Sequence, residues 1–186
     1  MIKIDTTIFS ERVCQGDIIA NVEFIEYAIE KDGQIEISKI LFPYVYVLTQ
    51  DCDLEQEYTN RIKPDPTNND KHLISVIVAP LYNLEQVYDG NHLEDIGLKM
   101  QTISRKSDKT DNKILKQNNN PRYHFLKFSD EIDITDSVID FKHYFTVNNN
   151  ILLKRKRESF VCKVSELYRE NISHRFSFFL SRIGLP

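Results

Sequence analysis

Three acidic side chains crowd into one short segment directly after a predicted buried strand. Asp51, Asp53 and Glu55 occupy alternate positions, so they would share one face if the strand continued through them. Together with Asp17, which follows a glycine turn, Asp51 and Asp53 could supply the carboxylate oxygens that Mg²⁺ prefers. The alternative is an exposed acidic loop in which Asp53 caps a turn or a helix.

Cys52 lies between two of these acids and is a candidate nucleophile, with His72, His124 or His143 as its base. Asp17, Asp51 or His72 could also supply a general acid or base, so Asp17, Asp51, Cys52 and His72 make up the candidate catalytic residues. Flanking carboxylates raise the pKa of a thiol, which favours a buried or idle cysteine instead. The three cysteines are dispersed and no Cys-x-x-Cys pair occurs, so neither a zinc site nor a disulfide framework is predicted. No cofactor is predicted either.

The strongest charge feature is the run Lys154, Arg155, Lys156 and Arg157. Residues 151–186 carry eight basic and three acidic side chains, a balance of +5, whereas the whole chain has a net charge of −4. With Arg175, this run could bind the phosphates of RNA or DNA. If the run lies on a strand, alternate side chains point to opposite faces and only two of the four meet one ligand. The alternative is a solvated strand end or a charged sheet edge.

Period-2 patterns predict that the first fifty residues form a meander of strands. Polar and apolar residues alternate from Asn21 in a strand over 18–27, and the pair Asp32-Gly33 is typical of a hairpin turn. A second strand follows over 35–39. A third, over 44–49, is apolar on both faces and is therefore predicted to be central. This arrangement predicts a curled sheet or a partly open barrel.

The rest of the chain adds strands, a short helix and a longer closing helix. Asn83 is placed to cap a helix that ends near Tyr88. After the N-cap candidate Ser165, apolar residues recur every three or four positions towards the stop candidate Gly184, which predicts a C-terminal helix packed across the sheet. Further strands are predicted over 72–81, where Pro80 is expected to end the strand, over 123–128 and over 137–147, and mobile loops over 58–71 and 104–120. The segment 104–120 fits either a surface helix or a loop that orders on binding.

Length and composition predict one α+β domain over residues 1–186. The chain has 41% hydrophobic and 28% charged residues, as ordinary globular proteins do. It contains no run of about 20 apolar residues, which a membrane span would need. The N-terminus lacks the pattern of a signal peptide. We therefore expect a cytoplasmic protein that does not engage the membrane.

One resemblance is carried by Gly16-Asp17-Ile18, by the hairpin after it, and by the run Pro43-Tyr44-Val45-Tyr46-Val47-Leu48-Thr49. Over about the first fifty residues the chain resembles the MazF/PemK-like toxin family, in which a Gly-Asp-Ile/Val strand and a later Pro-Val-Leu-Val-Val-Ser strand belong to an SH3-like barrel. The resemblance implies a barrel-like fold and an endoribonuclease activity. The basic residue that the family places just before the proline is Phe42 here, so the resemblance favours the fold over the cleavage chemistry.

Three functional hypotheses follow. The first is a non-catalytic interaction or regulatory module that binds a protein partner, within a bacterial stress or mobile-element system of the toxin–antitoxin or defence type. The second is a toxin-like endoribonuclease that binds nucleic acid through Lys154, Arg155, Lys156, Arg157 and Arg175. The third is a metal-dependent hydrolase built on Asp17, Asp51 and Asp53. The oligomeric state and the choice between enzyme and non-enzyme stay open.

Overall fold

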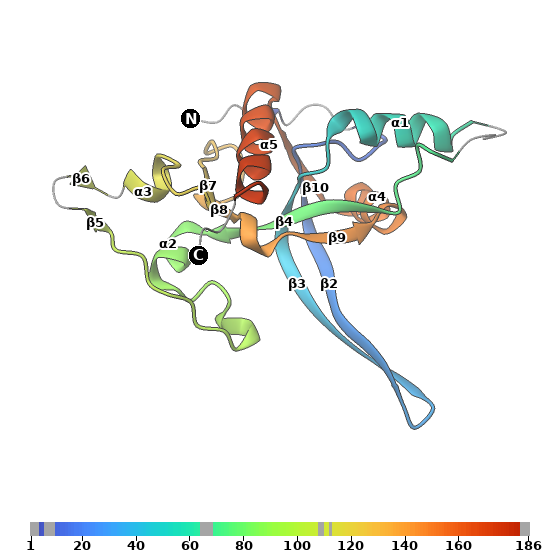
Figure 1. Ribbon diagram of the computed structural model, residues 1–186, viewed down its shortest axis with the longest axis horizontal. Helices are drawn as coiled ribbons and strands as arrows, with labels where there is room; N and C mark the ends of the chain where they lie inside the picture. The colour runs from blue at the N-terminus through green and yellow to red at the C-terminus, as the bar shows by residue number, and fades with distance from the viewer. Residues whose placement is uncertain (1–3, 6–9, 64–68, 108–109, 112, 183–186) are drawn as a thin grey trace.

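A strongly curled antiparallel sheet forms the body of the protein. The computed structural model describes residues 4–5, 10–63, 69–107, 110–111 and 113–182 (Figure 1). The helices and strands follow in the order β1 (Ile4–Asp5), β2 (Asp17–Lys31), β3 (Gln34–Val47), α1 (Asp51–Arg61), β4 (Ser75–Asn83), α2 (Leu84–Asp89), η1 (Glu94–Ile96), β5 (Lys106–Ser107), β6 (Thr110–Asp111), α3 (Lys113–Lys116), β7 (Tyr123–Leu126), β8 (Ser137–Asp140), η2 (Phe141–His143), β9 (Phe145–Asn148), α4 (Asn149–Ser159), β10 (Phe160–Val164) and α5 (Glu166–Leu180).

The main sheet has eight strands in the order β1-β10-β2-β3-β4-β8-β7, with β9 as an additional partner of β4. β4 pairs with β9 through Ser75–Val78 and then with β8 through Leu81–Asn83. Pro80 does not end this strand, contrary to the prediction from the sequence. It lies where one partner strand gives way to the next, and such breaks in pairing tolerate a proline.

Both faces of the central strands are buried, as the apolar run over 44–49 predicted. Val45, Tyr46 and Val47 are 0% exposed. Tyr46 belongs to the core on one face, which α5 covers with Ile172 and Phe176. Val45 and Val47 belong to the core on the other face, which receives residues from α1 and α4. The sheet thus lies between helices on both sides, and the predicted α+β class with a C-terminal helix across a curled sheet is confirmed.

The outer halves of β2 and β3 leave the body as a two-stranded ribbon (Figure 1). We call residues 23–41 the arm. Its tip is the predicted turn, in which Asp32 has φ 53° and Gly33 has φ 75°. Two residues with positive φ are the signature of a type I′ turn, which suits the twist of a hairpin.

Two segments predicted as extended are helices. Asp51, Asp53 and Glu55 lie on α1, so the alternate face proposed for a continuing strand does not exist. Lys154 to Arg157 lie on α4, whose N-cap Asn148 accepts hydrogen bonds from the backbone of Asn150 and Ile151. The predicted cap of α2 is confirmed, because the Asn83 side chain accepts from Glu85 N and Gln86 N.

Three other expectations meet the edges of the described residues. Ser165 is the N-cap of α5, although its side chain makes no capping hydrogen bond, and the stop candidate Gly184 lies outside the described residues. The predicted loop 58–71 begins inside α1, and its residues 64–68 lie outside the description. The segment 104–120 contains the strand pair β5–β6 and helix α3, with 108–109 and 112 outside. Among the described residues, no helix has the length and apolar character to cross a bilayer.

The packing of α5 on the sheet predicts a large loss of stability on truncating its buried face. Ile172 is 0% exposed, whereas Leu167 on the same helix is 74% exposed. We expect Ile172→Ala to lower the free energy of unfolding by about 2–5 kcal/mol. Leu167→Ala, the matched control, should change it by less than about 0.5 kcal/mol. Urea unfolding followed by circular dichroism measures both, and equal effects would contradict the packing.

Candidate functional site

The turn before β2 buries an ion pair. The Asp17 carboxylate accepts hydrogen bonds from Lys156 Nζ at 2.8 Å and from the Cys14 backbone N at 2.7 Å. Both charged residues are 0% exposed, and Lys156 Nζ also donates to the Arg12 carbonyl at 2.6 Å. Burial raises the pKa of the Asp17 carboxyl, while the charge of Lys156 opposes that shift. Asp17 therefore holds α4 against the start of β2.

Asp51, at the start of α1, forms a second ionic junction beside this turn. Its carboxylate accepts from Arg12 at 3.0 and 3.1 Å and from the Gln15 backbone N at 3.0 Å. Arg169 on α5 lies 3.3 Å from the same carboxylate. Burial alone would raise the pKa of Asp51, but the hydrogen bond and charge of Arg12 outweigh it and lower the pKa. Asp51 thus joins the loop before β2 to α1 and α5.

Gly16 lets these junctions approach each other closely. Its φ is +85°, and a Cβ at this position would lie 3.3 Å from Arg169 Cδ and from the Val164 carbonyl oxygen. A side chain here would combine a left-handed backbone with crowding. The Gly-Asp pair that carries the family resemblance therefore has a structural reason in this chain.

The predicted acidic metal site receives no support from this geometry. Asp17 and Asp51 are each neutralised by basic side chains, as described above, and Asp53 is exposed on α1. A cation would have to displace Lys156 or Arg12 to bind there. Within the described residues, the group of three side chains that could hold a metal lies elsewhere, at His92, Asp140 and His143.

Among the described residues, no hydrogen bond joins Cys52 to the histidines predicted as its base. Cys52 is exposed on α1, with Sγ 3.7 Å from the Gln50 side-chain oxygen. His72 lies 3.8 Å from Glu57, and His124 is buried at 3% exposure on β7. A shallow groove lined by Cys52 is shared instead with His174 of α5.

The basic run does not present one surface. Lys156 is buried against Asp17, whereas Lys154 and Arg157 are exposed on α4. Arg155 is half-buried and pairs with Glu158 at 3.2 Å. A test of nucleic-acid binding through α4 should therefore reverse the charges of Lys154 and Arg157 and leave Lys156 intact.

Arg175, predicted to bind nucleic acid with this run, lies on α5 and has a different role in the structure. It donates to the carbonyls of Asn120 and Tyr123 at 2.9 and 2.8 Å. These bonds tie α5 to the chain that enters β7. The structure therefore does not join Arg175 to α4 in a single basic patch.

A cluster that the sequence analysis missed gathers Tyr82, His92, Arg122, Asp140 and His143. The Tyr82 hydroxyl lies 3.1 Å from His143 Nδ1, and the same nitrogen lies 3.4 Å from the Asp140 carboxylate. The Arg122 guanidinium donates twice to Asp140, at 2.8 and 2.5 Å. The His92 ring lies 4.8 Å from the Tyr82 ring, centroid to centroid.

Burial sets the protonation of this cluster. It lowers the pKa of His92, with the nearby His143 adding to the effect, and it lowers the pKa of His143 despite the opposing charge of Asp140. Burial also raises the pKa of the Tyr82 hydroxyl. Both imidazoles are therefore neutral at physiological pH, the form that accepts a proton or binds a metal ion.

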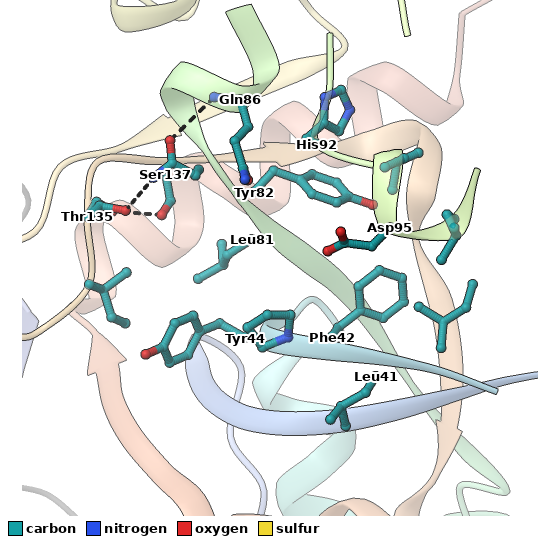
Figure 2. A pocket seen from close by; sticks show the side chains of 16 residues that line it. Leu41, Phe42, Tyr44, Leu81, Tyr82, Gln86, His92, Asp95, Thr135 and Ser137 are labelled. Atoms are coloured by element: carbon teal, nitrogen blue, oxygen red, sulfur yellow. Dashed lines mark hydrogen bonds between the residues drawn. The ribbon is translucent and has the colours of Figure 1, made fainter. Parts of the chain in front are cut away.

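His92 also lines a pocket of about 210 Å³ between the base of the arm and the loop after α2. Figure 2 shows apolar side chains of Leu41, Phe42 and Leu81 along the pocket, together with the polar side chains of His92 and Asp95. Gln86, Thr135 and Ser137 lie towards another part of the wall. An apolar lining with a few polar groups is the usual composition of a small-ligand pocket.

The sequence carried little signal for this cluster. Asp140 and His143 are three residues apart, but His92 and Arg122 come from distant segments, and all four meet only when β4, β7 and β8 pair side by side. Of its members, the sequence singles out His143 alone, as a candidate base for Cys52.

The arm carries several exposed apolar side chains. Ile25, Ile35 and Ile37 are 58%, 73% and 57% exposed. Ile25 pairs with Lys39, and Lys39, Ile37 and Ile35 alternate along β3, so the three isoleucines share one face of the ribbon. Tyr27 and Ile29 are exposed on the opposite face.

No protein-family model matches the chain, and no curated protein matches it either. The resemblance to MazF/PemK-like toxins therefore stays a prediction from the residues of the first strands.

The buried ion pair predicts that Lys156 matters far more than its neighbours on α4. We expect Lys156→Met to lower the free energy of unfolding by about 3–5 kcal/mol, because Asp17 would keep a buried charge without its partner. Adding Asp17→Asn should restore part of this loss. Lys154→Met, on the exposed face of the same helix, is the control and should have an effect below about 0.5 kcal/mol. Chemical denaturation would contradict the pair if the two lysine variants behaved alike.

His124 predicts a loss of stability in acid. Burial and then the charge of Arg175 lower the pKa of His124 to about 3, against about 6.5 in an unfolded chain. Between these values only the unfolded state binds the proton, so stability present above pH 6.5 falls as the pH decreases, by about 1.4 kcal/mol per pH unit for this group. His124→Gln should remove that part of the slope in unfolding measured across this range. An unchanged slope would show that His124 protonates in the folded protein.

Proposed function

We propose that the protein is a non-catalytic interaction module that binds a protein partner through the arm. The observation that carries the proposal is the exposed row of Ile25, Ile35 and Ile37 on a ribbon that projects from the body (Figure 1). Contiguous exposed apolar side chains mark interaction surfaces in soluble domains.

The arm is stabilised little by packing against the rest of the chain. A two-stranded hairpin is only marginally stable in water without a third strand or a packed face. The packed aromatic contacts stop at its base, where Phe24 and Phe42 lie 5.2 and 5.3 Å from Phe145, between ring centroids. Beyond that base, the burial of a partner's surface would supply the missing packing.

Charge limits the kind of partner. The arm carries five acidic and two basic side chains, a net charge of −3. One of them, Glu23, pairs with Lys39 across the ribbon at 2.7 Å. A partner with an apolar strip flanked by Lys and Arg would complement this surface. The ribbon edges also offer backbone groups for strand addition.

Nucleic-acid binding is the second candidate, favoured by the exposure of Lys154 and Arg157 on α4. These two cations would contact phosphates, and their interaction would weaken steeply with added salt. The acidic arm would be turned away from such a ligand by charge repulsion.

The partner can be identified and measured in two steps. A photo-crosslinking amino acid placed at position 37 should capture one protein in cells, whereas the same group at position 151 on α4, where Ile151 is also 62% exposed, should not. Calorimetry of the purified pair should then show at least about tenfold weaker binding for Ile35→Ser/Ile37→Ser, equivalent to about 1.4 kcal/mol.

Leu167→Ser, at another exposed apolar position, is the control and should bind like the wild type. Equal crosslinking at both positions, capture of a second copy of the chain alone, or unchanged affinity of the double variant would each contradict the proposal. A salt-sensitive gel shift with RNA or duplex DNA that is abolished by Lys154→Glu/Arg157→Glu would favour the second candidate.

A further inference from the structure

We infer that His92, Asp140 and His143 form a binding site for a divalent transition-metal ion of the Zn²⁺ type. One candidate ligand atom from each residue lies within 4.8 Å of the other two. The inference is independent of the arm, because the cluster and the exposed isoleucines share no residue.

The donor set fits such an ion. Two imidazole nitrogens and one carboxylate oxygen suit Zn²⁺ and related metals, whereas Mg²⁺ and Ca²⁺ favour oxygen ligands throughout. Metal–ligand bonds of about 2.0–2.2 Å place ligand atoms roughly 3.3 Å apart in a tetrahedron. The observed spacing of up to 4.8 Å therefore requires the ligand atoms to approach one another by at most about 1.5 Å.

His92 has two ring nitrogens whose capacity to bind a ligand is not used by hydrogen bonds of normal geometry. Both of its ring nitrogens are inaccessible to solvent and neither forms a hydrogen bond of normal geometry, although the Gln86 backbone lies close enough to the ring to interact with it. A buried polar group without a partner costs about 1–3 kcal/mol. Coordination of a metal ion through one nitrogen would remove most of that cost at this position.

Arg122 occupies the position of a supporting residue. Arg122 holds both oxygens of Asp140, which is 0% exposed, and the Lys142 backbone N donates to the same carboxylate at 3.0 Å. Each carboxylate oxygen has a second lone pair, so the one nearest His143 can accept from Arg122 and bind a metal together. Such outer contacts orient metal ligands and raise the affinity of a site.

The site would leave room for an exogenous ligand. Three protein ligands leave a tetrahedral ion with one open position, the arrangement of zinc sites that bind water or a substrate. Because His92 also lines the pocket of Figure 2, an ion held here would lie beside a space for a small molecule. The positive charge of the ion and of Arg122 together favours an anionic one.

Calorimetry with Zn²⁺ on the full chain, first stripped with a chelator, tests the site. The expected result is one ion per chain. Because outer partners alone are worth about 10–100-fold in metal affinity, His92→Ala and His143→Ala should each weaken binding by more than about 100-fold. His72→Ala and His174→Ala remove imidazoles elsewhere in the structure and should bind as the wild type does.

Co²⁺ added to the wild type provides a second measurement that does not depend on variants folding. Visible ligand-field bands without thiolate charge-transfer absorption are expected for nitrogen and oxygen ligands. The inference is overturned if the wild type takes up no Zn²⁺, if both cluster variants bind normally, or if charge-transfer bands show that a cysteine such as Cys52 holds the ion.

Discussion

The ion pair between Asp17 and Lys156 is the contact on which the arrangement of the elements depends. Both charges are removed from water, and a buried charge is tolerable only with a well-placed partner. The pair therefore fixes α4 against the start of β2. Asp51 forms a similar ionic junction nearby. Its ion pairs with Arg12 and Arg169 join α1 and α5 to the loop before β2. Three helices thus meet the sheet where the left-handed Gly16 leaves space for them.

The Asp17–Lys156 pair changes how the basic run Lys154 to Arg157 is interpreted. Four consecutive cations suggest a binding surface, but on a helix they point in different directions, and the fold takes Lys156 as an internal partner for an acid that is 139 residues away in the chain. Lys154 and Arg157 remain exposed, with Arg157 3.8 Å from Glu11, and Arg155 pairs with Glu158. A local excess of positive charge is therefore partly a structural requirement for neutralising buried acids, and only partly a surface property.

The features that could be predicted from the sequence are those set by short-range chemistry. The Asp32-Gly33 turn, the Asn83 cap and the strand apolar on both faces follow from local preferences and burial patterns, and the structure has all three. Helices α1 and α4 could not be predicted in this way, because each is mostly polar and buries only a few side chains, Leu54 and Leu152 among them. The histidine cluster could not be predicted from the sequence for a different reason. Its members come from separate segments, and only the pairing of β4, β7 and β8 brings them together.

The arm and the histidine cluster depart in opposite ways from the usual rule that apolar side chains are buried and polar groups are exposed or hydrogen-bonded. The arm turns isoleucines towards water, while the cluster turns the two ring nitrogens of His92 away from water without a hydrogen bond of normal geometry. Local departures from consistent burial concentrate where a protein meets something outside its own chain. Each departure also specifies what would correct it. Exposed apolar side chains need another apolar surface, and orphaned nitrogen lone pairs need a proton donor or a metal ion.

Phe42 lies between the two regions, 6.4 Å from the Tyr82 ring between centroids and at the base of the arm, so one continuous layer of aromatic side chains supports both.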